Sequence, residues 1–215
     1  IIAVDHLDID DGIIEDINGT APQAGIDIEP NYETDKVRKV VVTGLDIRNT
    51  VGPGITVVLT NVGLTEEYET DIEFTNLSLT SCSINVSTIN DMVKGRIFID
   101  FTAKDLGSIA FRTAGIRWPS TLDMTLRPRI HNHNMRNNTG GDGCAFFMSS
   151  SIGDVDLRGP RIIDLIITED APRSTGVVYS AGVFKDTRIV NPIAAPRISS
   201  HVPSDSLYPY EAVKI

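Results

Sequence analysis

Two carboxylates stand two residues apart in the stretch 25–31, where Asp27 and Glu29 alternate with isoleucines. Side chains two apart on a strand point to the same face, with Cα atoms about 6.8 Å apart. Such a pair can act as acid and base on a glycosidic bond, and the carboxyl separation then decides between inversion and retention. It can also hold Ca²⁺. The alternative is a solvated acidic strand end, with Pro30-Asn31 forming the following turn.

A second group of candidates lies in the longest insertion between predicted strands, residues 130–143. His131 and His133 share one face if the strand continues, which suits a general base or two metal ligands. A third ligand at fixed spacing is missing, so no metal site is predicted. Arg136 in this segment and Arg112 before it are candidates for binding an acidic sugar. The alternatives are histidines that join a surface ladder and arginines that are ordinary solvated surface.

No cofactor is predicted, and Ca²⁺ is kept as an alternative. The acidic run of residues 8–11 lacks the alternating oxygen ligands and distal Glu of an EF-hand. Cys82 and Cys144 fall two coils apart, roughly 10 Å at ~4.8 Å per strand, beyond the reach of a disulfide. Free, buried thiols are therefore predicted. Nucleotide chemistry is disfavoured, because no phosphate-cradling glycine loop is present.

Charge is unevenly distributed along the 215 residues. Residues 1–75 hold 16 acidic and 4 basic residues, whereas the remainder holds 13 acidic and 15 basic ones, and the net charge is −10. The sequence therefore predicts no nucleic-acid partner, because a phosphate-binding surface needs a cationic stripe. It also predicts no membrane span, since no run of about 18 apolar residues occurs.

The candidate residues must be positioned by short strands that recur along the chain. A small residue followed by apolar-X-apolar begins at residues 25, 54, 83, 108, 143 and 176. This spacing, with little helical periodicity, predicts a solenoid in which each coil buries its inward face against its neighbours. Leucine-rich repeats would show a fixed Leu spacing, and propeller blades need about 40 residues each. A parallel β-helix of about six coils is the predicted architecture.

A longer strand precedes this element in each of the first three repeats. Its alignment predicts three apolar columns, composed of Leu7, Val40 and Ile72, of Ile9, Val42 and Phe74, and of Ile14, Ile47 and Leu79. Later repeats carry the apolar core on residues 97–101, on Met124 to Ile130 and on residues 162–167, with a register less clearly defined.

The run from Ile14 to Asn31, followed after Asp35 by three valines, is similar to the right-handed parallel β-helix proteins of the pectate-lyase-like superfamily. These include polysaccharide lyases, glycosidases, uronan epimerases and phage tailspikes. The resemblance covers roughly residues 1–180 and is most specific in Gly-Ile-Asp-Ile-Glu-Pro-Asn. It implies an all-β, single-stranded right-handed parallel β-helix, here a fragment that begins within the solenoid and lacks its N-terminal cap.

The resemblance also implies a polar ladder at the turn between the two strands of each repeat. Asp16, Asn49 and Ser81 align there, and these residue types bond neighbouring turn backbones. Weaker continuations are Asp105, Asn132 and Asp170. We interpret these residues as structural rather than catalytic.

Residues 1–188 are predicted to form the coils, and residues 189–215 an irregular C-terminal extension or cap, because four prolines interrupt the pattern there. In a tailspike-like protein this extension would touch partner subunits, as in a homotrimer.

Two classes of function follow from the resemblance. The first is an extracellular polysaccharide-binding protein that degrades its glycan as a hydrolase or lyase. Asp27 and Glu29 would be its acid and base, and its substrate-binding residues would be Arg112, His131, His133 and Arg136. The second is a non-catalytic structural or adhesion solenoid, such as a virion tailspike or a cell-surface fibre. Both place the protein outside the cell, on a cell surface or on a virion. The sequence leaves open whether the chain is an enzyme.

Overall fold

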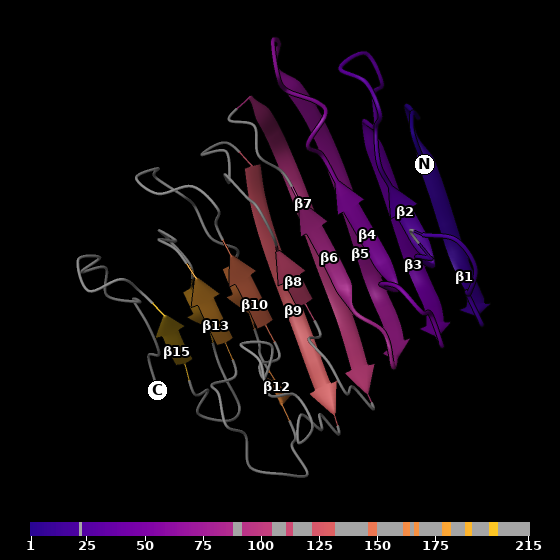
Figure 1. Ribbon diagram of the computed structural model, residues 1–215, viewed down its shortest axis with the longest axis vertical. Coiled ribbons are helices and arrows are strands. Elements are labelled where there is room, and N and C mark those ends of the chain that lie inside the picture. Colours follow the sequence, from indigo (N-terminus) through magenta and orange to yellow (C-terminus); the bar gives the residue numbers. More distant parts are fainter. Residues whose placement is uncertain are drawn as a thin grey trace.

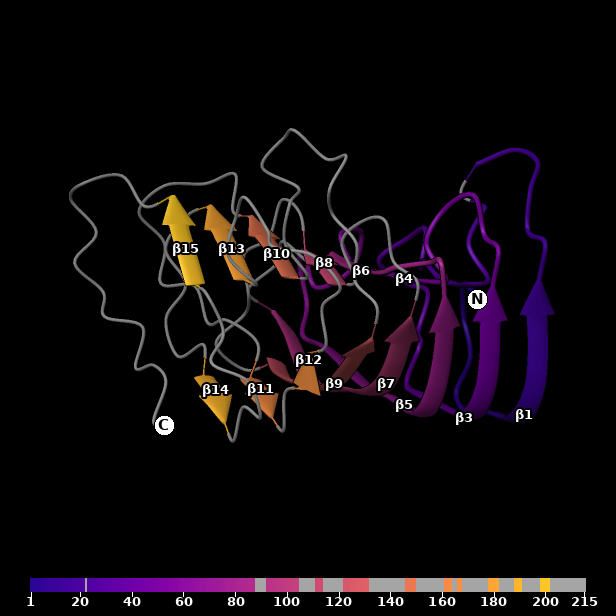
Figure 2. The same cartoon turned by 90° about the horizontal axis from the view of Figure 1, so that it is seen from below.

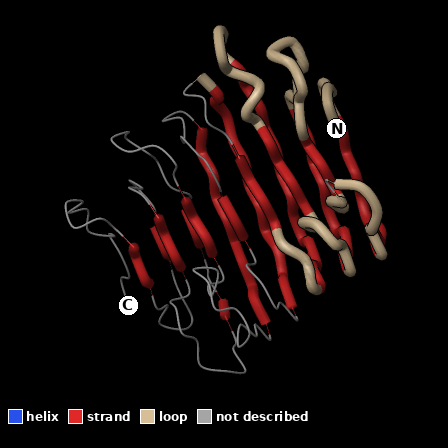
Figure 3. The backbone as a smooth tube through the Cα atoms, in the orientation of Figure 1, coloured by secondary structure: helices blue, strands red, loops and turns tan. Residues whose placement is uncertain are grey.

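The protein is built from β-strands, without helices in the described part of the chain (Figure 3). The computed structural model describes residues 1–21, 23–87, 92–104, 111–113 and 122–131, together with short strands between residues 146 and 201. Side chains are described in the first three of these ranges, at Phe111 and at residues 122–130.

The strands form two parallel sheets between which the chain alternates (Figures 1 and 2). The long-strand sheet contains, in spatial order, β1 (Leu7–Glu15), β3 (Lys39–Arg48), β5 (Tyr68–Thr80), β7 (Val93–Lys104), β9 (Leu122–His131), β11 (Arg161–Ile163) and β14 (Arg188–Val190), with β12 (Ile166–Ile167) also paired to β9. The short-strand sheet contains β2 (Ile26–Ile28), β4 (Ile55–Val58), β6 (Ile84–Ser87), β8 (Phe111–Thr113), β10 (Phe146–Ser149), β13 (Val178–Ala181) and β15 (Ile198–His201).

Each neighbouring pair within a sheet is one turn of the chain apart, which makes the fold a parallel β-solenoid, as predicted. Residues 1–113 wind through four turns, β1–β2, β3–β4, β5–β6 and β7–β8, and the strands from β9 onward continue both sheets. The predicted boundary of the coils near residue 188 stays a prediction.

The predicted columns of the long-strand sheet are confirmed. Leu7 pairs with Val40 and Val40 with Ile72, Ile9 with Val42 and Val42 with Phe74, and Ile14 with Ile47 and Ile47 with Leu79. The side chains of β3 and β5 in these columns are fully buried. Apolar alternation within each strand therefore fixed both the inward face and the register between turns.

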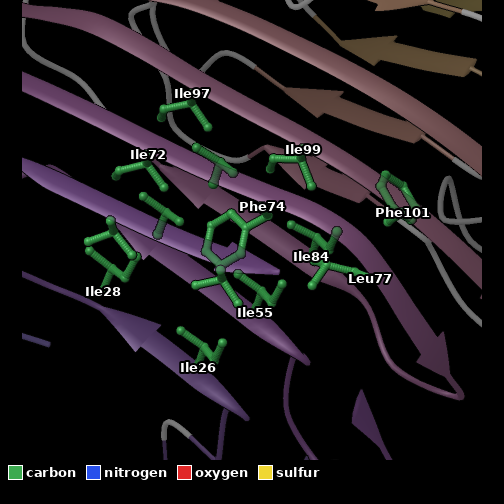
Figure 4. Close-up of a cluster of buried hydrophobic side chains, with 14 of the residues drawn as sticks. Ile26, Ile28, Ile55, Ile72, Phe74, Leu77, Ile84, Ile97, Ile99 and Phe101 are labelled. Carbon is green, nitrogen blue, oxygen red and sulfur yellow. The ribbon is translucent and has the colours of Figure 1, made fainter. Parts of the chain in front are cut away.

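In the short-strand sheet, Ile26, Ile55 and Ile84 stack in one column, as predicted (Figure 4). Each has at most 6% of its surface exposed. The small residue before this column is explained by close packing between turns. A Cβ on Gly25 would lie 2.8 Å from the carbonyl oxygen of Gly54, so a larger residue there would push two turns apart.

The long strands of the first three turns each contain one residue with a left-handed backbone. These residues are Asp11, Gly44 and Asn76, with φ between 46° and 71°, and they follow one another from turn to turn. In β3 the buried positions change from Val40 and Val42 to Leu45 and Ile47, a step of three instead of two. We call this position the mid-strand corner.

The predicted turn ladder is also present. Asp16, Asn49 and Ser81 all have φ of 55–57°, and the Asn49 side-chain amide donates to the Asp16 carboxylate at 3.3 Å. Each of the three backbone N–H groups donates to a carbonyl of the next turn, on Arg48, Thr80 and Lys104. Asp and Asn tolerate this backbone better than most residues. The continuations at Asp105, Asn132 and Asp170 lie outside the described residues.

The predicted register was wrong at two later points of the short-strand sheet. Ile84 pairs with Phe111 and not with Ile109, and Phe146 pairs with Val178 and not with Tyr179. In the first segment, Ile109 and Phe111 are two apart and share a face, so alternation could not choose between them. In the second, residues 177–179 are all apolar, so there was no alternation to select a face. Cys82 is free and buried as predicted, and Cys144 lies outside the described residues.

Candidate functional site

Asp27 and Glu29 lie on the outward side of the short-strand sheet, as predicted. Their neighbours Ile26 and Ile28 are buried, whereas both acidic residues are half-buried. The backbone here also contacts the start of the chain. The amino group of Ile1 donates to the Asp27 carbonyl at 2.5 Å, and the Glu29 N–H donates to the Ile1 carbonyl at 2.9 Å.

Asp27 begins a row of polar residues that crosses the short-strand sheet. It pairs with Thr56, which pairs with Asn85, which in turn pairs with Arg112. At about 4.8 Å per strand, Asp27 and Arg112 are roughly 14 Å apart along the axis. The structure therefore places two of the predicted site residues in one row, which we call the Asp27 row.

Two side-chain atoms of the Asp27 row have no hydrogen-bond partner. Asp27 Oδ1 and Thr56 Oγ1 are both enclosed, and no described group bonds to either. Buried polar atoms in native proteins are usually paired with protein or water. Either side chain can turn toward a ligand without breaking a protein hydrogen bond, which makes this point of the row receptive to one.

His131 is not brought to this row. His131 is the last residue of β9 in the long-strand sheet, where it pairs with Lys104. Arg112 belongs to the short-strand sheet, so the two are separated by the fold. His133 and Arg136 lie outside the described residues, and their proposed roles stay predictions.

Sequence reasoning missed the charged rows on the outward face of the long-strand sheet. Successive strands place Lys39, Asp71, Arg96 and Asp123 side by side, with alternating charge. Arg96 contacts Asp71 at 2.9 Å and Glu73 at 2.6 Å. The acidic and basic residues were visible in the sequence, but their pairing requires the register of the fourth turn.

A groove of about 660 Å³ opens on this face at the start of β3, β5 and β7. It is lined by Lys36, Arg38, Lys39, Glu67, Glu69, Thr70, Asp71, Gly95 and Arg96. Beside it, the Tyr68 hydroxyl accepts the Val37 N–H at 2.7 Å, so a side chain takes the place of a strand partner there. Burial raises the pKa of Tyr68.

A carboxylate ties the loops of the first two turns together. The Glu33 carboxylate accepts the N–H groups of Leu64, Thr65 and Glu66 at 3.0–3.3 Å. Desolvation favours a higher pKa for Glu33, but these three hydrogen bonds and the charge of Lys36 outweigh it and lower the pKa. The loop of residues 64–66 therefore binds an anion through three backbone N–H groups, and the anion is the Glu33 carboxylate of the same chain.

Metal binding gains no support from the described part of the chain. No three His, Cys, Asp or Glu side chains gather there as a metal site would require. The acidic run of residues 8–11 lies within β1, where Asp8 and Asp10 are exposed, and Asp11 forms the corner. The calcium alternative for that run therefore has no ligand cluster among the described residues.

Compared with protein-family models, curated proteins and solved structures, the chain gives no match. Among the described residues, no helix combines the length and apolar character of a membrane span.

Proposed function

We propose that the protein binds an extracellular polysaccharide along the Asp27 row. The observation that carries this proposal is the pair of unsatisfied polar atoms, Asp27 Oδ1 and Thr56 Oγ1, on neighbouring strands of an outward face. A sugar hydroxyl both donates and accepts hydrogen bonds, so it can serve a carboxylate and a hydroxyl together.

The shape of the fold supports the same ligand. Parallel strands repeat the row at a constant interval of about 4.8 Å, and an extended glycan also presents similar groups at regular intervals. Asn85 continues the row with an amide, and Arg112 holds the next position. A polymer laid along the axis would meet a polar residue at each turn.

Degradation of the bound polymer is the further part of this proposal. Asp27 and Glu29 would act as acid and base, and Arg112 would hold an acidic sugar, in keeping with the resemblance to the pectate-lyase-like superfamily. His133 and Arg136 would bind more distant sugar units. His131, which belongs to the other sheet, is not part of this proposal. A protein of this kind acts outside the cell, on a cell surface or on a virion, where a tailspike-like homotrimer would present several such rows.

Binding is tested with a panel of neutral and acidic polysaccharides and the Thr56→Val variant. Valine keeps the shape of threonine and removes only an unpaired hydroxyl, so the fold should be as stable as before. We expect about a tenfold loss of affinity from the lost hydrogen bond. Ser78→Ala, which removes an outward hydroxyl from the long-strand sheet, is the matched control. Equal binding by both variants, or no binding by the wild type, would overturn the proposal.

Cleavage is tested separately on any polysaccharide that binds. New reducing ends without unsaturated sugars indicate a hydrolase, and unsaturated products indicate a lyase. Asp27→Asn and Glu29→Gln should each abolish the products while binding persists. Binding without cleavage by the wild type would instead favour the non-catalytic structural or adhesion solenoid.

A further inference from the structure

The groove on the long-strand sheet gathers charges of both signs on adjacent segments. Lys36, Arg38 and Lys39 come from the start of β3 and the loop before it. Glu67, Glu69 and Asp71 come from the start of β5 and the residue before it, one turn further along. The Asp71 N–H donates to the Arg38 carbonyl at 2.8 Å, so the basic and acidic segments lie side by side.

Opposite charges that are in register on this face normally pair with each other. Glu15 and Arg48 are register partners and form an ion pair at 2.8 Å. Asp71 and Arg96 are register partners and do the same at 2.9 Å. An unpaired charge beside its register partner is therefore an exception that needs an explanation.

Two such exceptions in the described part of the chain line the groove. Lys39 is the register partner of Asp71, but Asp71 is held by Arg96. Glu69 is the register partner of Lys94, but the Lys94 ammonium is bound to Glu67 at 2.5 Å and interacts with the Glu69 charge only without a direct ion pair. No described residue forms an ion pair or hydrogen bond with the side chain of Lys39 or of Glu69. One ammonium and one carboxylate are thus left open at the same groove.

In both cases the expected partner is engaged by a third residue: Arg96 binds Asp71, and Glu67 binds Lys94. Arg96 reaches both Asp71 and Glu73 with its fork of donors, which a lysine cannot match. Gly95 also lines the groove, and its φ of +108° is a backbone that side chains rarely allow. A Cβ there would collide with the Thr70 backbone of β5, so the close pairing of the two strands at the groove requires glycine. The groove thus retains its two open charges.

We propose that this groove binds a small dipolar ligand that carries an ammonium and a carboxylate on a short polar skeleton. The carboxylate would bind Lys39, next to Lys36, and the ammonium would bind Glu69. Each contact is a charge-assisted hydrogen bond in a concave site, where such bonds are stronger than on open surface. A volume of about 660 Å³ is ample for such a ligand.

This inference does not rest on glycan binding at the Asp27 row, because the groove belongs to the other sheet. Its two requirements are specific. Both charges must be present on one molecule, and their separation must match that of Lys39 and Glu69.

The test uses a set of ω-amino acids as a ruler for charge separation: glycine, β-alanine, γ-aminobutyrate, δ-aminovalerate and ε-aminocaproate. Binding to the whole chain is followed by chemical-shift changes of the backbone amides near Lys39, Glu69 and Gly95. Butyrate and butylamine, which carry one charge each, serve as ligand controls. We expect one chain length to bind best, and about tenfold more tightly than either single-charge control.

Variants then assign the two contacts. Lys39→Gln and Glu69→Gln should each weaken the best ω-amino acid about tenfold and leave the weak binding of one single-charge control unchanged. Lys104→Gln, at the far end of β7, is the matched control and should change nothing. Equal binding of all chain lengths, or equal binding by Glu69→Gln and the wild type, would overturn the proposal, as would a lack of shifts at these amides.

Discussion

The long strands of the first three turns change their inward-facing phase at one left-handed residue in mid-strand, whereas β7 and β9 have no such change in mid-strand, and the positive φ of β7 lies near its start, at Gly95. In β5 the buried side chains change phase across Asn76, from Phe74 to Leu77. In β7 the buried positions run from Ile97 to Ala103 at every second residue, and β9 is regular in the same way. We call the first three turns the corner region and the strands from β7 onward the straight region. Both regions contribute strands to the same sheet, although a strand of the corner region has one more residue across the corner.

The difference is absorbed at a single interface. The pairing of β5 with β7 shifts between Phe74 and Leu77, so the extra residue of β5 has no partner in β7. Pairing of β3 with β5 has a constant register on both sides of the corner. A solenoid can therefore change its cross-section between two turns, provided that the apolar residues on either side still face inward.

The two regions also stabilise their outward faces differently. In the corner region, Thr43 and Thr75 join hydroxyl groups at 3.0 Å. In the straight region, Asp100 is contacted by Arg129 at 2.7 Å and by Arg127 at 3.7 Å. In the middle of the strands, the hydroxyl pair of the first region is replaced by ion pairs in the second, although the first region has ion pairs at its strand ends, such as Glu15 with Arg48. The middle of the second region should therefore be the more dependent on salt.

The largest loss of stability is expected from Gly44→Val, which places a β-branched side chain at the mid-strand corner. Gly44 has φ of +71°, and a Cβ there would collide with the Asp11 carboxylate. That carboxylate is the end of a flexible, exposed side chain and can turn aside, so the backbone dominates the effect. A left-handed backbone costs about 1–2 kcal/mol for an ordinary residue and more for a β-branched one, so we expect the free energy of unfolding to fall by about 2–3 kcal/mol. Urea denaturation measures the change.

Two further variants separate strain from collision. Asp11→Gly combined with Gly44→Val should recover only the part of the loss that comes from displacing the Asp11 carboxylate. Glycine is used because residue 11 also has a left-handed backbone, with φ of 46°. Thr102→Val, on the outward face of straight strand β7, should stay within about 0.5 kcal/mol of wild type. If Gly44→Val were as stable as Thr102→Val, the corner would not need its glycine.

The next effect is expected in the straight region. Asp100→Asn removes the charge that Arg127 and Arg129 share, and should lower the free energy of unfolding by about 1–2 kcal/mol. The wild-type advantage should shrink as salt is added to the denaturation series. Thr75→Val in the corner region should lower the free energy of unfolding by an amount that salt does not change. If that loss depended on salt, the two regions would not differ in their electrostatics.

A smaller effect is expected at Asn76, where two substitutions should differ in sign or size. Asn76→Gly fits φ of 53° without a Cβ and should be close to neutral, whereas Asn76→Val should cost about 1–2 kcal/mol. The same pair of changes at Asp100, which lacks a left-handed backbone, should reverse the order, since valine suits a strand better than glycine. Thermal unfolding of the four variants checks this.

The smallest effect concerns the loops of the first two turns and depends on pH. The folded protein lowers the pKa of Glu33 below its ordinary value of 4.5, so the carboxylate contributes stability above that pH. This contribution is lost as pH falls through the lower pKa of the folded state. Glu33→Gln should destabilise the protein at neutral pH and flatten its acid-side decline.

Denaturation series from neutral pH to well below 4.5 measure this slope. Glu66→Gln keeps the backbone donor of residue 66 and serves as the control, with the wild-type slope expected. An unchanged slope in Glu33→Gln would mean that the three N–H groups of the loop do not hold the charge.

Much of the architecture was predictable because alternation acts within each strand. Leu7, Val40 and Ile72 were aligned correctly from the sequence, as was the turn ladder at Asp16 and Asn49. The candidate site was predictable only in its orientation. The sequence indicates that Asp27 and Glu29 face outward, but the unpaired state of Asp27 Oδ1 depends on atoms from other turns.

The sequence alone determined which residues turn inward where apolar and polar residues alternate clearly, as in the first three turns, since every second side chain of a strand shares a face. Only the tertiary structure decided where a strand takes an extra left-handed residue, because that choice is settled when neighbouring turns stack. The tertiary structure also decided that Asp71 forms its ion pair with Arg96 and not with Lys39. Several counter-ions lie on the neighbouring strands, and the one that the side chain can reach forms the pair.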